Sequence, residues 1–204
     1  VDNASRGLYV AGLKTSVSAS DLVSARTKSS PVSGRGAGVV LVYGASMSLQ
    51  RASILSNRQV GVAVETGDSS LVAEAVRIEG TTPSETGLLG HGLAVSLGAS
   101  VTLAKAAVVA NAGAGMVAMA KWGTDMPSSL VATDVLVADT QPYADGSGGS
   151  GVISIDEATV ELTRAALVEN RGVGLDAHDG AQVHALDLLV ARTKSSPDST
   201  GGLG

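Results

Sequence analysis

The polar residues best suited to chemistry lie in the segment LDAHDG at 175–180. Asp176 and His178 are two residues apart, so they share one face of an extended strand, and Asp179 follows at a turn. A histidine beside two carboxylates could bind a divalent metal or act as a general base. The segment offers fewer ligands than a metal ion needs, so we expect a solvated turn and no metal site.

A second histidine, His91, stands between Gly90 and Gly92. A glycosidase needs two carboxyl groups about 5–10 Å apart across the scissile bond. His91 has no such acidic neighbours in the sequence. We therefore expect a loop residue beside a turn glycine, without a catalytic role.

The composition excludes several classes of protein. The 204 residues include no cysteine, which excludes disulfides, thiolate nucleophiles and cysteine-based zinc sites. A net charge of −5 argues against a nucleic-acid partner, and the lack of a run of about 18 apolar residues argues against a membrane span. There is no P-loop, nucleotide fingerprint or Ser-His-Asp arrangement, so no cofactor is implied.

Internal repetition organises the whole chain. The peptide ARTKSSP occurs at 25–31 and 191–197, and GASMSL at 44–49 recurs as GASVTL at 98–103. A wider frame of Asn, three residues, Gly and an alternating apolar pair begins at Asn3, Asn57, Asn111 and Asn170. Recurring glycines divide the chain into short units of 23 residues and long units of 31 or 36 residues: Gly7, Gly38, Gly61, Gly92, Gly115, Gly151 and Gly174.

The segments within each unit are typical of strands. They are short, rich in Val and Leu, and bounded by Gly, Ser or Asn. We expect three such strands in each unit. Their alternation directs two sets of residues to the interior: Leu8, Val39, Val62, Leu93, Met116, Val152 and Leu175, then Val10, Leu41, Val64 and Val95. Aromatic residues make up only 2% of the chain, so this core must be thin and aliphatic.

These repeated segments resemble those of right-handed parallel β-helices, the pectate-lyase-like solenoids. More narrowly, they are similar to bacterial secreted or surface β-helix repeat proteins. The resemblance covers essentially the whole chain. It implies an all-β fold with one domain, 1–204, of about seven coils that alternate short and long rungs, and a secreted or bacterial cell-surface location. The segment GHG at 90–92 also resembles a short motif of β-helix polygalacturonases, but the clustered aspartates of those enzymes are missing.

The extra residues of the long units begin in one place, after Thr27, Thr81, Thr140 and Thr193. Each Thr is followed closely by a proline, and Gly, Ser and Asp then dominate. We expect loops that leave the tube at one corner and form its interaction surface. The Asn residues of the frame should form a structural ladder, bonded to local backbone or to one another.

The outer faces carry two further columns. Arg51, Lys105 and Arg164 of the short units should interleave with acidic residues of the long units, Asp21, Glu74, Asp134 and Asp187. The outer side of the first strand is apolar instead: Tyr9, Val40, Ala63, Ala94, Val117 and Ile153. Such a column needs cover from the Thr-Pro loops, a partner or self-association.

Neither end of the sequence shows a cap, so we expect a segment of a longer solenoid that can associate end to end. Two functions remain open. One is a non-enzymatic surface protein with a structural, adhesive or binding role toward a polysaccharide or another protein. The other is a carbohydrate-active β-helix enzyme or carbohydrate-binding module. Sugar grooves usually use Trp and Tyr as stacking platforms, and the four such residues here should lie on distant coils, which favours the first.

Overall fold

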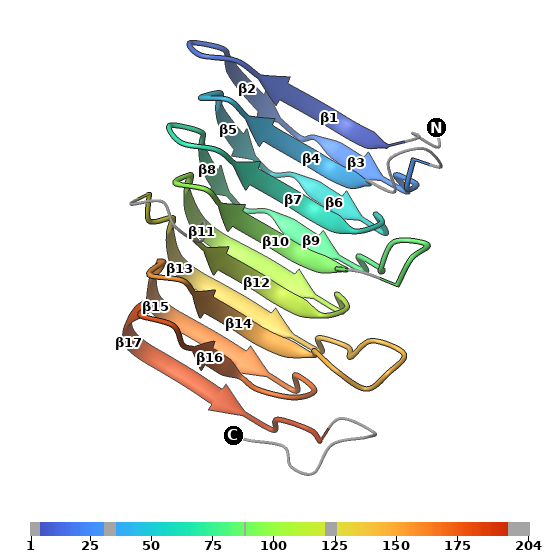
Figure 1. Ribbon diagram of the computed structural model, residues 1–204, viewed down its shortest axis with the longest axis vertical. Helices are drawn as coiled ribbons and strands as arrows, with labels where there is room; N and C mark the ends of the chain where they lie inside the picture. The colour runs from blue at the N-terminus through green and yellow to red at the C-terminus, as the bar shows by residue number, and fades with distance from the viewer. Residues whose placement is uncertain (1–4, 31–35, 88, 121–125, 196–204) are drawn as a thin grey trace.

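The computed structural model describes residues 5–30, 36–87, 89–120 and 126–195 (Figure 1). Over these residues the chain is all-β, without a helix. Its strands form two sheets, and each pair of neighbouring strands in them is parallel. The expectation of an all-β fold with parallel strands is confirmed.

The first sheet contains seven strands, and each strand pairs with the one that follows it in the repeat. Figure 1 shows them stacked in chain order from the N-terminus to the C-terminus. Their bounds, in sheet order, are β1 (Arg6–Ala11), β4 (Ala37–Val42), β7 (Val60–Glu65), β10 (His91–Ser96), β12 (Ala114–Met119), β14 (Ser150–Ile155) and β16 (Leu175–Ala177).

The second sheet stacks in the same order. Its main path comprises β2 (Ser16–Ser20), β5 (Ser46–Gln50), β8 (Ser70–Glu74), β11 (Ser100–Val109), β13 (Ser129–Ala138), β15 (Thr159–Val168) and β17 (Gln182–Ala191). Beside it lie β3 (Val23–Ala25), β6 (Ser53–Leu55) and β9 (Arg77–Glu79).

The number of strands per unit differs from the expected three in the later part of the chain. From β11 onward the second and third strands join into one strand of ten residues. Each of these strands turns at a residue of positive φ, such as Lys105 (φ 53°) or Asp134 (φ 55°). The left-handed residue bends the strand, and pairing resumes on both sides of it.

The core lies between the two sheets and is built as predicted. Leu8, Val39, Val62, Leu93, Met116, Val152 and Leu175 pair in register along the first sheet. The five inner residues of this column are buried, and the two end residues, Leu8 and Leu175, are partly buried. The core cluster contains Val, Leu, Ile, Ala and Met side chains and, among the described residues, no aromatic ring.

The glycine before each inward apolar residue is required by close packing between successive strands. A Cβ atom on Gly38 would lie 2.6 Å from the Gly61 carbonyl oxygen and 2.6 Å from Asn57 Nδ2. One on Gly61 would lie 2.5 Å from the Gly92 carbonyl oxygen. These contacts are far shorter than a real Cβ makes, so the glycine spacing seen in the sequence is a steric consequence of stacking.

Candidate functional site: a groove on the outer face of the first sheet

The outer face of the first sheet carries a second hydrophobic cluster, separate from the core. It comprises Ala37, Val40, Val42, Val60 and Ala63, whose exposed fractions are only 4–7%. Leu89, from the loop that precedes β10, packs against them. The apolar outer column expected from the sequence is therefore present, and a residue of the loop after Thr81 contributes to its cover.

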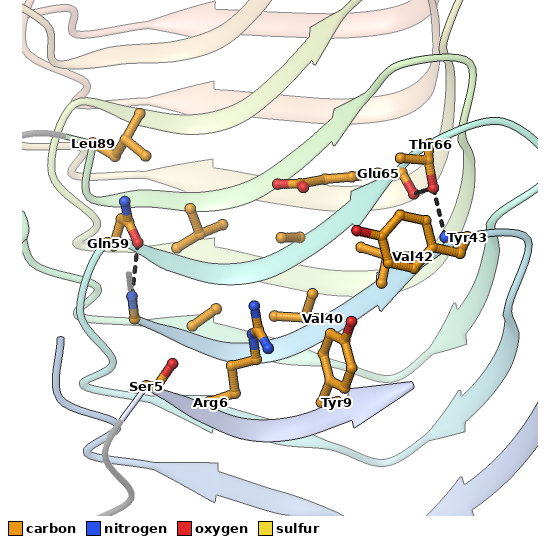
Figure 2. Close-up of a pocket in the computed structure, with 14 residues that line it drawn as sticks. Ser5, Arg6, Tyr9, Val40, Val42, Tyr43, Gln59, Glu65, Thr66 and Leu89 are labelled. Carbon is orange, nitrogen blue, oxygen red and sulfur yellow. Dashed lines mark hydrogen bonds between the residues drawn. The ribbon is translucent and has the colours of Figure 1, made fainter. Parts of the chain in front are cut away.

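A cavity of about 250 Å³ lies over this apolar floor. Polar and aromatic residues surround it: Ser5, Arg6, Tyr9, Tyr43, Gln59, Glu65 and Thr66 (Figure 2). The guanidinium carbon of Arg6 lies 4.3 Å from the centroid of the Tyr9 ring, within cation–π distance. We call this cavity with its floor and rim the outer groove.

Two tyrosines line the outer groove together, which corrects the expectation that the aromatic residues lie on distant coils. Tyr9 belongs to β1 and is 43% exposed, and Tyr43 follows the adjacent strand β4 and is 63% exposed. The Tyr43 backbone N–H donates a hydrogen bond to Thr66 Oγ1. The repeat frame places the two tyrosines in neighbouring units, and this was the signal that sequence reasoning passed over.

The charged groups of the outer groove differ from those of the second sheet. Arg51, Lys105 and Arg164 bind Asp21, Glu74 and Asp134 at 2.7, 2.7 and 2.6 Å, so the predicted opposite charges do meet across adjacent strands. Hydrogen bonds from the two arginines lower the pKa values of Asp21 and Asp134. In contrast, within the part of the chain that the structure describes, Arg6 and Glu65 have no ion-pair partner.

The Asn residues of the repeat frame lie at a corner of the fold and bond to backbone. Oδ1 of Asn57, Asn111 and Asn170 accepts the N–H of Thr27, Thr81 and Thr140 at 3.0, 3.0 and 3.2 Å. Their Nδ2 atoms donate at 3.2 Å to the carbonyl oxygens of Ser24, Ile78 and Val137.

Each Asn amide therefore ties a short unit to the long unit before it, at the point where a Thr loop begins. Asn57, Asn111 and Asn170 are fully buried, so ligands do not reach them. No bond between two of these amides occurs among the described residues. Thr193 is partly buried, and Asn3 lies outside the described residues.

The Asp176, His178 and Asp179 side chains lie together but on the surface. His178 Nδ1 is 2.8 Å from Asp179 Oδ2, and Nε2 is 4.0 Å from Asp176 Oδ2. The hydrogen bond with Asp179 raises the pKa of His178. Asp176 pairs with Ile153 of the neighbouring strand β14, and this apolar side chain offers no ligand to a metal ion. Within the described ranges, no three His, Cys, Asp or Glu side chains are placed to hold a metal ion.

His91 is the first residue of β10, so the expectation of a loop residue was wrong. It pairs with Val60, is 9% exposed, and its Nδ1 has no hydrogen-bond partner among the described residues. Burial lowers its pKa to about 4, which leaves the ring neutral at pH 7. Burial alone causes that shift, so among the described residues no charged group acts on His91.

Comparisons with known proteins return no match: no protein-family model, no curated protein and no solved structure matches the chain. The structure alone therefore defines its class, an all-β protein of stacked parallel strands that is compatible with a parallel β-solenoid. Its described residues include no helix long and apolar enough to cross a membrane.

Proposed function

We propose that this protein is a non-enzymatic binding protein of the secreted or cell-surface type, built as a right-handed parallel β-helix of about seven coils. The support for this architecture is the parallel stacking of both sheets in chain order, together with the alternation of short and long units. A narrow aliphatic core is typical of such a tube because each unit packs only on its neighbours.

The outer groove is the observation that carries the binding role. It combines a concave apolar floor with a few polar groups at its rim, which is the usual construction of a ligand site. Glu65 is the only carboxylate among the described residues that line it, and no histidine lines it. Glycosidases typically use two carboxyl groups across the scissile bond, so the described lining favours binding of a ligand over glycoside hydrolysis.

The outer groove adjoins two of the loops. Leu89 precedes β10 in the loop that begins after Thr81, and Gly36 precedes β4 in the loop that begins after Thr27. Both residues line the cavity. Figure 1 shows the described parts of the connections after β3, β9 and β13, residues 26–30, 80–87 and 139–149, on one side of the stack. We propose that these loops, with the groove beside them, meet the partner.

A carbohydrate-binding module is the second candidate, and the pair Tyr9 and Tyr43 favours it. Exposed aromatic rings offer flat apolar faces, and their hydroxyl groups can hydrogen-bond. Polysaccharides therefore belong among the first ligands to test, along with peptides and other small molecules.

The experiment is a binding screen with a groove variant. The purified protein is tested on a glycan array and against small-molecule and peptide collections, and polysaccharide degradation is assayed in parallel. Binding that Tyr9→Ala abolishes, and that Val72→Ala on the exposed face of the second sheet preserves, supports the proposal. Ligands that bind both variants equally would contradict a groove site, and the release of new sugar ends would contradict a non-enzymatic role.

A further inference from the structure

The position of the two unpaired charges in the outer groove indicates the chemistry of its ligand. Arg6 begins β1 and Glu65 ends β7, so the two residues flank the floor from the first and third of three adjacent strands. Figure 2 shows the Arg6 guanidinium, the Tyr9 and Tyr43 hydroxyls and the Glu65 carboxylate around the same stretch of floor. The ligand therefore meets a cationic group and an anionic group across an apolar surface.

Arg6 is held ready to bind a carboxylate. Its guanidinium stacks on the Tyr9 ring at 4.3 Å, which restricts the long side chain. The planar group has five N–H donors and matches a carboxylate in a bidentate arrangement. No acidic residue among those described occupies that role.

Glu65 selects for a positive group at the other side of the floor. A ligand with a carboxylate alone would leave Glu65 unpaired in a groove that is partly shielded from water, and a simple cation would do the same to Arg6. A neutral sugar would pair with neither charge. A zwitterion with an apolar body satisfies both charges and the floor of Val and Ala side chains.

The dimensions of the groove match a short peptide. Arg6 is in register with Ala37 and Val60, and Glu65 lies five residues further along β7. The two backbone positions are therefore about 10 Å apart across the strands and about 17 Å apart along them. The long side chains of both residues extend over the floor between these positions and shorten the gap that a ligand must span (Figure 2). An extended peptide of two or three residues spans about 7–10 Å. We propose, on the basis of the binding function above, that the outer groove binds short zwitterionic peptides with apolar side chains, with the carboxylate on Arg6 and the ammonium on Glu65.

Titration calorimetry with three forms of one dipeptide tests this assignment. Leu-Leu carries both charges, its N-acetyl form lacks the ammonium, and its amide lacks the carboxylate. Hydrogen bonds to charged groups are strong enough that we expect each blocked form to bind at least about tenfold more weakly than Leu-Leu. Equal binding of the three forms, or no saturable binding of Leu-Leu, would overturn the proposal.

Two variants assign the charges to their residues. In Arg6→Gln, the amide should bind as well as Leu-Leu, and in Glu65→Gln the N-acetyl form should do so. Arg51→Gln removes a paired arginine of the second sheet and should leave the affinity unchanged. Unchanged Leu-Leu affinity in both groove variants, with circular dichroism spectra like the parent's, would also overturn the proposal.

The failure of this inference can be told apart from the failure of the proposed function. A saccharide or other ligand that Tyr9→Ala abolishes, in a protein that ignores Leu-Leu, would refute the peptide and leave the groove as a binding site. If no ligand in any arm depended on Tyr9, Arg6 or Glu65, the binding function itself would be refuted.

Discussion

Replacing Asn111 with alanine should destabilise the fold more than any surface change, because its buried amide holds two backbone groups. Asn111 Oδ1 accepts the Thr81 N–H at 3.0 Å, and its Nδ2 donates to the Ile78 carbonyl at 3.2 Å. Asn111, Thr81 and Ile78 are all at most 1% exposed, so water cannot replace the amide without a rearrangement of the corner.

The magnitude follows from the groups left unpaired. Each buried donor or acceptor without a partner costs about 1–3 kcal/mol, and Asn111→Ala leaves two of them, so it should lower the free energy of unfolding by about 2–6 kcal/mol. For a chain of this length, one kcal/mol lowers the melting temperature by about 2–4 °C. We therefore expect the melting temperature to fall by about 4–24 °C, measured by circular dichroism during heating and confirmed by urea denaturation.

Two threonine variants serve as matched controls for this reasoning. Thr81 Oγ1 is buried and has no hydrogen-bond partner among the described residues, whereas Thr140 Oγ1 donates to Asn170 Oδ1 at 2.7 Å. Thr81→Val should be neutral or stabilising, and Thr140→Val should cost about 1 kcal/mol. An unchanged melting temperature in Asn111→Ala, or equal losses in the two threonine variants, would refute the argument that buried amide bonds hold this corner.

Three further outcomes are expected. Val95→Asp places an unpaired charge at a fully buried core position, so it should unfold or fray the sheets; a protein with native circular dichroism would contradict the core assignment. Because burial lowers the pKa of His91 from 6.5 to about 4, the unfolded state takes up the proton first, so stability should fall by about 3 kcal/mol between pH 6.5 and 4. In urea denaturation across this pH range, His91→Leu should remove this loss of stability. His178→Gln should retain the loss, because folding raises the pKa of His178 and does not lower it. An equal dependence of stability on pH in His91→Leu and the parent would contradict the assignment to His91. Replacing residues 143–147, which form a turn closed by the Tyr143 N–H to Ser147 carbonyl bond, with two glycines should preserve the β-sheet spectrum, and loss of that spectrum would show that the loop is part of the fold.

The parts of the structure that sequence reasoning predicted are those set by neighbouring units. In a stack of parallel strands, a residue meets its counterpart one unit away, so the repeat spacing alone identifies the partner. This is why the column from Leu8 to Leu175 and the pair Arg51–Asp21 could be found without coordinates. Close packing permits only glycine at positions such as Gly38, and these recurring glycines made the repeat spacing recognisable in the sequence.

The features that sequence reasoning missed depend on the backbone conformation of single residues, at places where the alternation of inward and outward side chains stops. Gly90 turns the chain with φ +111°, and pairing begins at once at His91, which converts an expected loop residue into a buried strand residue. Likewise, the bend at Lys105 joins two expected strands into one. A periodic pattern does not report these single dihedral angles.

The sequence by itself determined the all-β class, the stacking register and the aliphatic core, because those follow from a pattern repeated along the whole chain. Only the tertiary structure decided that Tyr43, beyond the end of its strand, shares a cavity with Tyr9, and that Leu89 packs on the floor. The turn at Tyr43 and Gly44 (φ 59° and 78°) recurs at Leu97 and Gly98 (φ 59° and 82°), but the tyrosine itself does not recur there, and Leu89 lies in the irregular part of a long unit. The repeat frame indicates only that Tyr9 and Tyr43 stand in neighbouring units, and the cavity between them depends on side chains that do not recur from unit to unit.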